Sequence, residues 1–139
     1  MSRWFHCLLL VALVTSIAMT AGCQEKSNKE TFSEISDRLA EGMDELDSQP
    51  GIRLTGYAAN PDDNLFKIGI EYDSTLITNA QLKEIIVDYL SSAASNSPTE
   101  DWREMLKPYR VRIEKLGDKT TFPVIAEKQS DETELEWER

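Results

Sequence analysis

The chain has 139 residues, of which 25 are aspartate or glutamate and 15 are lysine or arginine, so its formal net charge at pH 7 is −10. A chain this negative repels phosphate backbones and anionic lipid headgroups, which argues against nucleic acid as a partner. The length is sufficient for one hydrophobic core. One histidine and two cysteines provide little material for a metal centre.

The first 22 residues have the pattern of a secretory signal peptide, with a short basic start at Arg3, an apolar run and a small-residue end. The residues Thr20-Ala21-Gly22-Cys23 resemble the lipobox of bacterial prolipoproteins, with Thr20 where that family usually has leucine. The resemblance implies cleavage between Gly22 and Cys23 and attachment of a diacylglycerol to the Cys23 thiol. Two acyl chains give stable anchoring, whereas one holds a protein only marginally.

The lipobox resemblance implies a lipid-anchored location on the extracytoplasmic side of the cell membrane, with acyl chains such as palmitate on Cys23. Gln24 after the cysteine is compatible with transfer to the outer membrane in a diderm bacterium. Residues 23–30 are then a polar tether, because they are too hydrophilic to bury themselves. Two alternatives remain open for the same segment: an uncleaved membrane anchor, and cleavage after Ala18 that releases a soluble protein.

Removal of residues 1–22 would also remove His6, Cys7 and Arg3. The remaining chain would be more acidic, would contain no histidine, and would use its single cysteine to carry lipid. Zinc sites built from cysteine and histidine are then excluded, as are Cys-His and Ser-His nucleophile systems. We therefore expect no metal, no cofactor and no enzymatic activity.

Residues 31–46 are predicted to form an amphipathic helix that begins with a capping box between Thr31 and Glu34. The apolar residues recur at steps of three and four, which places them on one face: Phe32, Ile35, Leu39, Met43 and Leu46.

Two strands, 52–60 and 65–73, are predicted to follow as a β-hairpin, because turn-forming residues separate them. The second strand alternates regularly between apolar and polar residues. In the first strand, the alternation places Ile52 and Leu54 on the core face and Tyr57 on the opposite face.

A second helix is predicted to begin at Thr78, with Gln81 as its capping-box partner. A short third helix would follow, with Ser97 as its N-cap, Pro98 as its first residue and Glu100 as its box partner.

The last predicted strands are 109–116 and 121–127, and Pro123 favours an edge position for the second of them. Residues 129–139 read as an acidic tail that is either disordered or an extension of the last strand.

The predicted element order is therefore α-β-β-α-α-β-β. This order favours an α+β fold: a two-layer sandwich of an approximately four-stranded, mostly antiparallel sheet with two main helices and one short helix. We expect a single domain over residues 31–128.

Arg110 and Arg112 share one face of the strand 109–116, so they are candidates for contact with an anionic group of a partner. Other basic residues that would extend this strip are Arg53, Lys67 and Lys115. The alternative is that the two arginines form cross-strand ion pairs with glutamates such as Glu71 and Glu127.

Trp102 and Tyr57 are the other candidate interaction residues, since tryptophan is enriched at interface hot spots. Burial in the core is the alternative for both. Residues 60–64 contain several oxygen ligands of the kind that calcium prefers, but they lack EF-hand spacing and also fit a plain hairpin turn.

Together these features favour a non-enzymatic protein-interaction module of the bacterial cell envelope, anchored in the membrane through Cys23. The alternative is a small-ligand or cation-binding lipoprotein.

Overall fold

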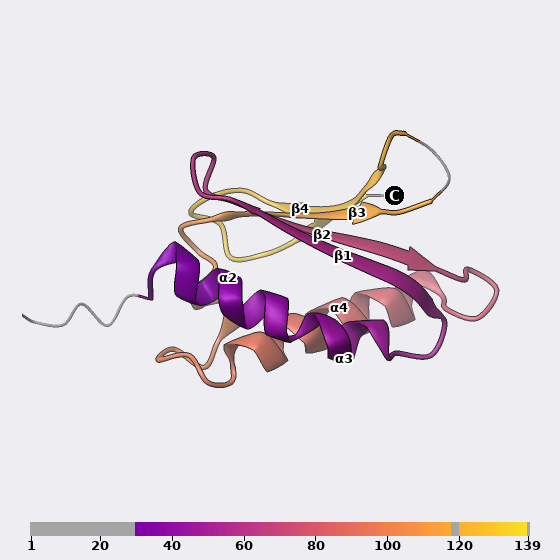
Figure 1. Ribbon diagram of the computed structural model, residues 1–139, viewed down its shortest axis with the longest axis horizontal. Coiled ribbons are helices and arrows are strands. Elements are labelled where there is room, and N and C mark those ends of the chain that lie inside the picture. The colour runs from indigo at the N-terminus through magenta and orange to yellow at the C-terminus, as the bar shows by residue number, and fades with distance from the viewer. Residues whose placement is uncertain (1–29, 118–119, 139) are drawn as a thin grey trace, which may run out of the picture.

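The structure is a computed structural model that describes residues 30–117 and 120–138. The expected signal peptide, the cleavage site at Gly22 and Cys23, and nearly all of the tether lie outside the described residues. The described part is an α+β fold in which a five-stranded sheet, in the order β1-β2-β3-β4-β5, carries its helices in a layer on one face (Figure 1). None of the described helices is long and apolar enough to cross a membrane.

The predicted first helix is divided into α2 (Phe32–Glu41) and α3 (Met43–Asp47). Its capping box is confirmed: the Thr31 amide donates to Glu34 Oε2 over 2.7 Å, and the Glu34 amide donates to Thr31 Oγ1 over 3.3 Å. The two helices meet at Gly42, where a Cβ atom would lie 2.9 Å from the Tyr89 ring. Glycine therefore permits close packing against the next helix, and its low helix propensity explains the break.

The β-hairpin is confirmed as β1 (Ile52–Asn60) paired antiparallel with β2 (Leu65–Tyr72). The predicted facing of β1 is right for Ile52, which packs against the core, but wrong from Leu54 onward. Leu54 is 52% exposed on the face away from the helices, whereas Tyr57 faces the helices and donates a 3.0 Å hydrogen bond to Ser36 of α2. A register shift between Ile52 and Leu54 accounts for this, because one extra residue moves the following side chains to the other face.

The second helix, α4 (Asn79–Ala94), begins with the predicted capping box between Thr78 and Gln81. The short helix α5 (Trp102–Met105) begins later than predicted, because Asp101 rather than Ser97 is its N-cap. These two helices return the chain across the sheet, so β3 (Arg110–Lys115) pairs parallel with β2. The other three strand pairings are antiparallel.

The sheet has one strand more than predicted. β5 (Glu136–Trp137) pairs antiparallel with β4 (Val124–Lys128), and Leu135 beside it is only 8% exposed. The prediction that Pro123 places β4 at the sheet edge is wrong, because β4 lies between β3 and β5. Pro123 immediately precedes the strand. The C-terminal segment thus contributes a short strand to the sheet, which fits the strand-extension alternative for residues 129–139.

One apolar core lies between the helix layer and the sheet. It includes a stack of Phe32 on Phe66, with ring centroids 4.4 Å apart, and Tyr109 packs edge-on against both rings. Alternate residues of β3 complete it, since Val111 and Ile113 are fully buried. The residues between them, Arg110 and Arg112, therefore project from the opposite face of the sheet.

Candidate interaction surface

The open face is the face of the sheet away from the helix layer, and none of the described helices covers it (Figure 1). β2, β3 and β4 run side by side there, and each contributes at least one charged side chain to this face. The side chains joined by ion pairs on this face are called the charged array here: Lys67, Arg110, Arg112, Glu114 and Glu127.

Glu127 is at the centre of the charged array. Its Oε1 atom accepts hydrogen bonds from Nη2 of Arg110 over 2.9 Å and from Nη2 of Arg112 over 3.1 Å. Glu114 is more loosely held, 3.9 Å from Nη1 of Arg112 and 3.8 Å from Nζ of Lys67. The array contains three cations and two carboxylates.

The electrostatics of Glu127 reflect two opposing effects. Partial burial alone raises the pKa of this carboxyl group, but hydrogen bonds and positive charge from Arg110 and Arg112 outweigh burial and hold the pKa below its usual range. The Nε atoms of both arginines are buried without a hydrogen-bond partner. The array is therefore held together by the terminal guanidinium nitrogens.

The four candidate interaction residues do not come together. Arg110 and Arg112 are neighbours on the open face, as their shared strand face indicates. Trp102 is only 3% exposed and lies in the core. Its position therefore fits burial in the core, the alternative to an interface role. Tyr57 is half-buried on the helix side, where burial raises the pKa of its hydroxyl group.

The other basic residues considered from the sequence are distributed over the sheet. Lys67 joins the array, whereas Arg53 donates to Asp73 over 2.6 Å near the start of β1. Lys115 lies 4.9 Å from the ring centre of Tyr72. Of the two glutamates expected to pair with the arginines, Glu127 does so. No ion pair involves Glu71 in the part of the chain that the structure describes.

The free edge of β1 is a feature that the sequence reasoning missed. β1 is the first strand in the sheet order, so among the described residues only one of its sides is paired. Its residues 54–60, Leu-Thr-Gly-Tyr-Ala-Ala-Asn, carry no charge. This uncharged run is the signal from which the edge could have been suspected.

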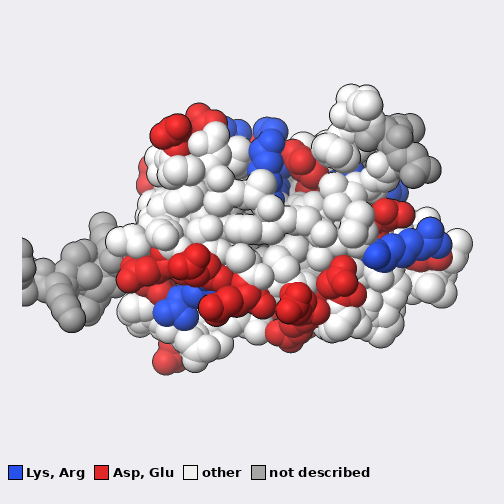
Figure 2. All heavy atoms as spheres, viewed as in Figure 1, with Lys and Arg blue, Asp and Glu red and all other residues white. Residues whose placement is uncertain are grey.

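A line of exposed carboxylates runs along α2 and α3, next to β1. Figure 2 shows it as a red band beneath an uncharged strip of surface that lies over β1. We call this line the acidic row, and define it as Asp37, Asp44 and Asp47.

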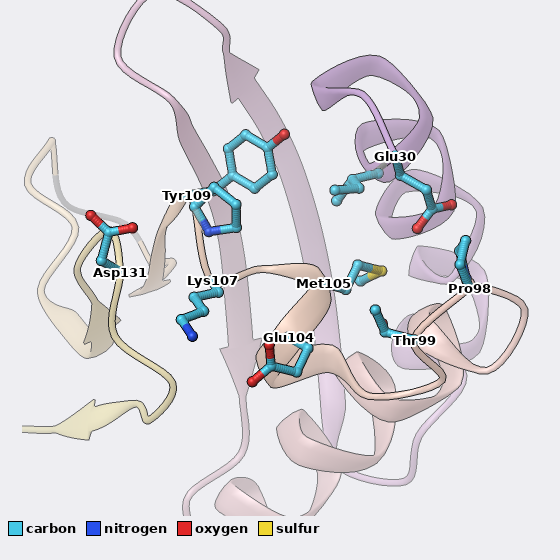
Figure 3. Close-up of a pocket in the computed structure, with 10 residues that line it drawn as sticks. Glu30, Pro98, Thr99, Glu104, Met105, Lys107, Tyr109 and Asp131 are labelled. Atoms are coloured by element: carbon cyan, nitrogen blue, oxygen red, sulfur yellow. The ribbon is translucent and has the colours of Figure 1, made fainter. Parts of the chain in front are cut away.

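A cavity of about 430 Å³ lies between α5, the start of β3 and the N-terminal end of α2 (Figure 3). Apolar atoms of Ile35, Met105 and Tyr109 form part of its lining. Charged residues also line it, and they are Glu30, Glu104, Lys107 and Asp131.

Within residues 30–117 and 120–138, no group of three or more histidine, cysteine, aspartate or glutamate side chains is arranged to hold a metal ion. The oxygen-rich residues 60–64 form a turn that is held by hydrogen bonds among its own residues. Asn60 donates to Asp63 Oδ2 over 2.6 Å, and the Asp62 amide donates to Asn60 Oδ1 over 3.1 Å.

Comparison with known proteins found no match among protein-family models, curated proteins or solved structures.

Proposed function

We propose that this chain is a lipid-anchored, non-enzymatic protein-interaction module on the extracytoplasmic side of the bacterial cell membrane. The observation that carries the proposal is that the described helices pack on only one face of the sheet. Two surfaces of the sheet are left uncovered by them: the open face with its charged array, and the free edge of β1. Surfaces of this kind are recurrent sites of protein recognition.

The position of the domain start supports the anchor. Glu30 lies seven residues after Cys23 and already contributes an ion pair to Arg38 of α2, so a residue this close to the proposed lipid site belongs to the folded part. An extended chain advances about 3.5 Å per residue, so lipid on Cys23 would hold the domain within roughly 25 Å of the membrane surface. A protein held this close meets partners that are themselves membrane-bound or lie against the membrane.

The absence of histidine after residue 22 supports a non-enzymatic role. The commonest general base would be missing, and the only remaining cysteine would be acylated. The carboxylates of the charged array are engaged by cations, which suits recognition better than proton transfer.

The anchor is tested by the intact mass of protein extracted from membranes, beside the Cys23→Ser variant. We expect wild type to begin at Cys23 and to carry the mass of a diacylglycerol, and the variant to remain unprocessed. Wild type without lipid would refute the anchor.

The interaction role is tested in cells with a photo-crosslinking residue in place of Lys67 on the open face. A matched control carries it in place of Glu84, an exposed residue of α4. We expect one defined adduct from position 67 and none from position 84. The same crosslinked adducts from both positions would count against the open face as the interaction surface.

The cavity beside Tyr109 is the observation that favours the second candidate function, binding of a small ligand or cation. Three carboxylates and Lys107 line it together with apolar atoms, a mixture typical of ligand sites. A ligand that binds only the folded state raises the melting temperature. A screen of divalent cations and cationic metabolites that gives a clear shift, abolished by Glu104→Gln, would support this candidate over the first.

A further inference from the structure

We propose that the free edge of β1 accepts an extended segment of a partner protein as an additional strand of the sheet, and that this segment carries lysine or arginine on its helix-facing side. The inference rests on the proposed function, because it names the partner class of the interaction module.

The backbone of β1 provides the first part of the argument. The strand is nine residues long, and across residues 53–60 the described structure records backbone hydrogen bonds to β2 only. In an antiparallel pair, alternate residues direct both their N–H and C=O groups away from the partner strand. About half of these residues therefore present unpaired groups along the free side, which is the template for strand addition.

Over residues 54–60 the edge lacks the devices that usually prevent strand addition. Sheet edges are commonly protected by lysine, proline, bulges or very short strands. Residues 54–60 contain no charge and no proline, and the register shift lies before them, between Ile52 and Leu54. The opposite edge differs, because β5 has only two residues and one of them is Glu136.

The acidic row determines which partner suits the edge. It borders β1 directly, because Thr55 of β1 donates a 3.2 Å hydrogen bond to Oδ1 of Asp47. An added strand alternates its side chains between the two faces of the sheet. Those on the helix side would meet the carboxylates of α2 and α3, so lysine or arginine is favoured there.

The residues on the other side of the added strand meet different chemistry. On the open face, β1 presents Leu54, Gly56 and Ala58, which are uncharged and mostly small. Leu54 is 52% exposed and supplies apolar surface. The partner segment is thus expected to alternate basic residues with apolar β-formers.

A second copy of this chain does not suit the edge. Antiparallel pairing of two β1 strands about a two-fold axis perpendicular to the sheet would place both helix layers on the same side. The two acidic rows would then face each other across the junction. Repulsion between like charges opposes such a dimer, so the geometry points to a heterologous partner.

The test uses the full mature chain in detergent and three nine-residue fluorescent peptides. The first alternates lysine and valine, the second has the same composition with its lysines clustered, and the third alternates glutamate and valine. We expect saturable binding of the first alone. Equal binding of the clustered peptide would overturn the proposal, because it would show charge attraction without strand pairing. No binding of the alternating lysine peptide would also overturn it.

Two further measurements locate the bound strand. The alternating lysine peptide should slow amide hydrogen exchange at alternate residues within 53–60. The triple variant Asp37→Asn, Asp44→Asn, Asp47→Asn should weaken binding by about tenfold, since each exposed charge contributes modestly.

The matched control is Glu134→Gln, Glu136→Gln, Glu138→Gln, which removes the same charge around the opposite edge and should leave the affinity unchanged. Binding without slower exchange at 53–60, or equal weakening by both triple variants, would overturn the proposal.

Failure of this proposal is distinguishable from failure of the proposed function. The peptide measurements do not depend on the lipid on Cys23. A protein that is lipidated and crosslinks through Lys67, but does not bind the peptide, would retain the proposed function with the open face as its surface.

Discussion

Nζ of Lys128 donates a 2.8 Å hydrogen bond to the carbonyl oxygen of Tyr109, the residue immediately before β3. The same ammonium group also donates to the carbonyl oxygens of Gln129 and Glu132, each over 2.9 Å. Lys128 is fully buried, so a cation is enclosed by backbone oxygens from two segments of the chain. It joins the C-terminal segment to the domain.

We expect Lys128→Met to destabilise the fold by about 2 kcal/mol, because methionine fills the space but leaves buried carbonyl oxygens without a donor. Urea unfolding monitored by circular dichroism measures this change. Lys107→Met is the control, since the Lys107 side chain is exposed and should be replaceable with little change. Faster hydrogen exchange in β5 should accompany the Lys128 substitution. Equal stability of the two variants would contradict this role.

Glu127→Gln should reduce stability at pH 7 by about 1 kcal/mol, because two arginines lose their shared carboxylate and the group is only partly exposed. The folded pKa of Glu127 lies below the unfolded value of 4.5. Its contribution is therefore complete above pH 4.5 and is lost as the pH falls through the folded pKa. Urea unfolding of both proteins at pH 7 and pH 3 should show a difference that shrinks at the lower pH. A difference independent of pH would refute the assignment.

Gly51→Ala should destabilise the protein by about 2 kcal/mol or more. Gly51 has φ +87°, a conformation that alanine adopts only with strain, and a Cβ atom there would lie 2.6 Å from the buried Ile77 side chain. Gly117→Ala is the matched control, because no atom of the described residues lies within 4 Å of the added atom and stability should change by less than about 0.5 kcal/mol. Thermal unfolding of both variants tests the difference. Similar melting temperatures would show that the turn at Gly51 tolerates a side chain.

Thr75→Val should raise the pKa of Asp73. Hydrogen bonds from the Thr75 hydroxyl and amide, followed by the bond from Arg53, lower this pKa from 3.8 to about 2. Because the pKa is depressed, the stabilisation from this carboxylate is present above pH 3.8 and is lost as the pH falls towards 2. Carboxyl carbon NMR titration gives the value directly. Arg53→Gln should produce a smaller rise, and a larger rise from Arg53→Gln would reverse the proposed order of causes.

Local features of this protein followed from the sequence alone. The capping boxes at Thr31 and Thr78 each involve residues three positions apart, so the chain's own spacing specifies them. The hairpin of β1 and β2 is similarly local, since turn-forming residues join two apolar runs. These features support the α+β class, and the facing of Arg110 and Arg112 follows from simple alternation along one strand.

Features that depend on distant partners were decided by the tertiary structure. The register shift between Ile52 and Leu54 turns Tyr57 towards the helices, and no periodicity within β1 reveals it. Glu127 rather than Glu71 pairs with the arginines because β4 lies beside β3 in a register that places Glu127 opposite Arg112. Pairing of β5 with β4 protects one side of the sheet and leaves β1 as the long uncharged edge. A sequence pattern specifies which face a side chain takes within its own strand, whereas strand order and register are set by the packing of the whole core.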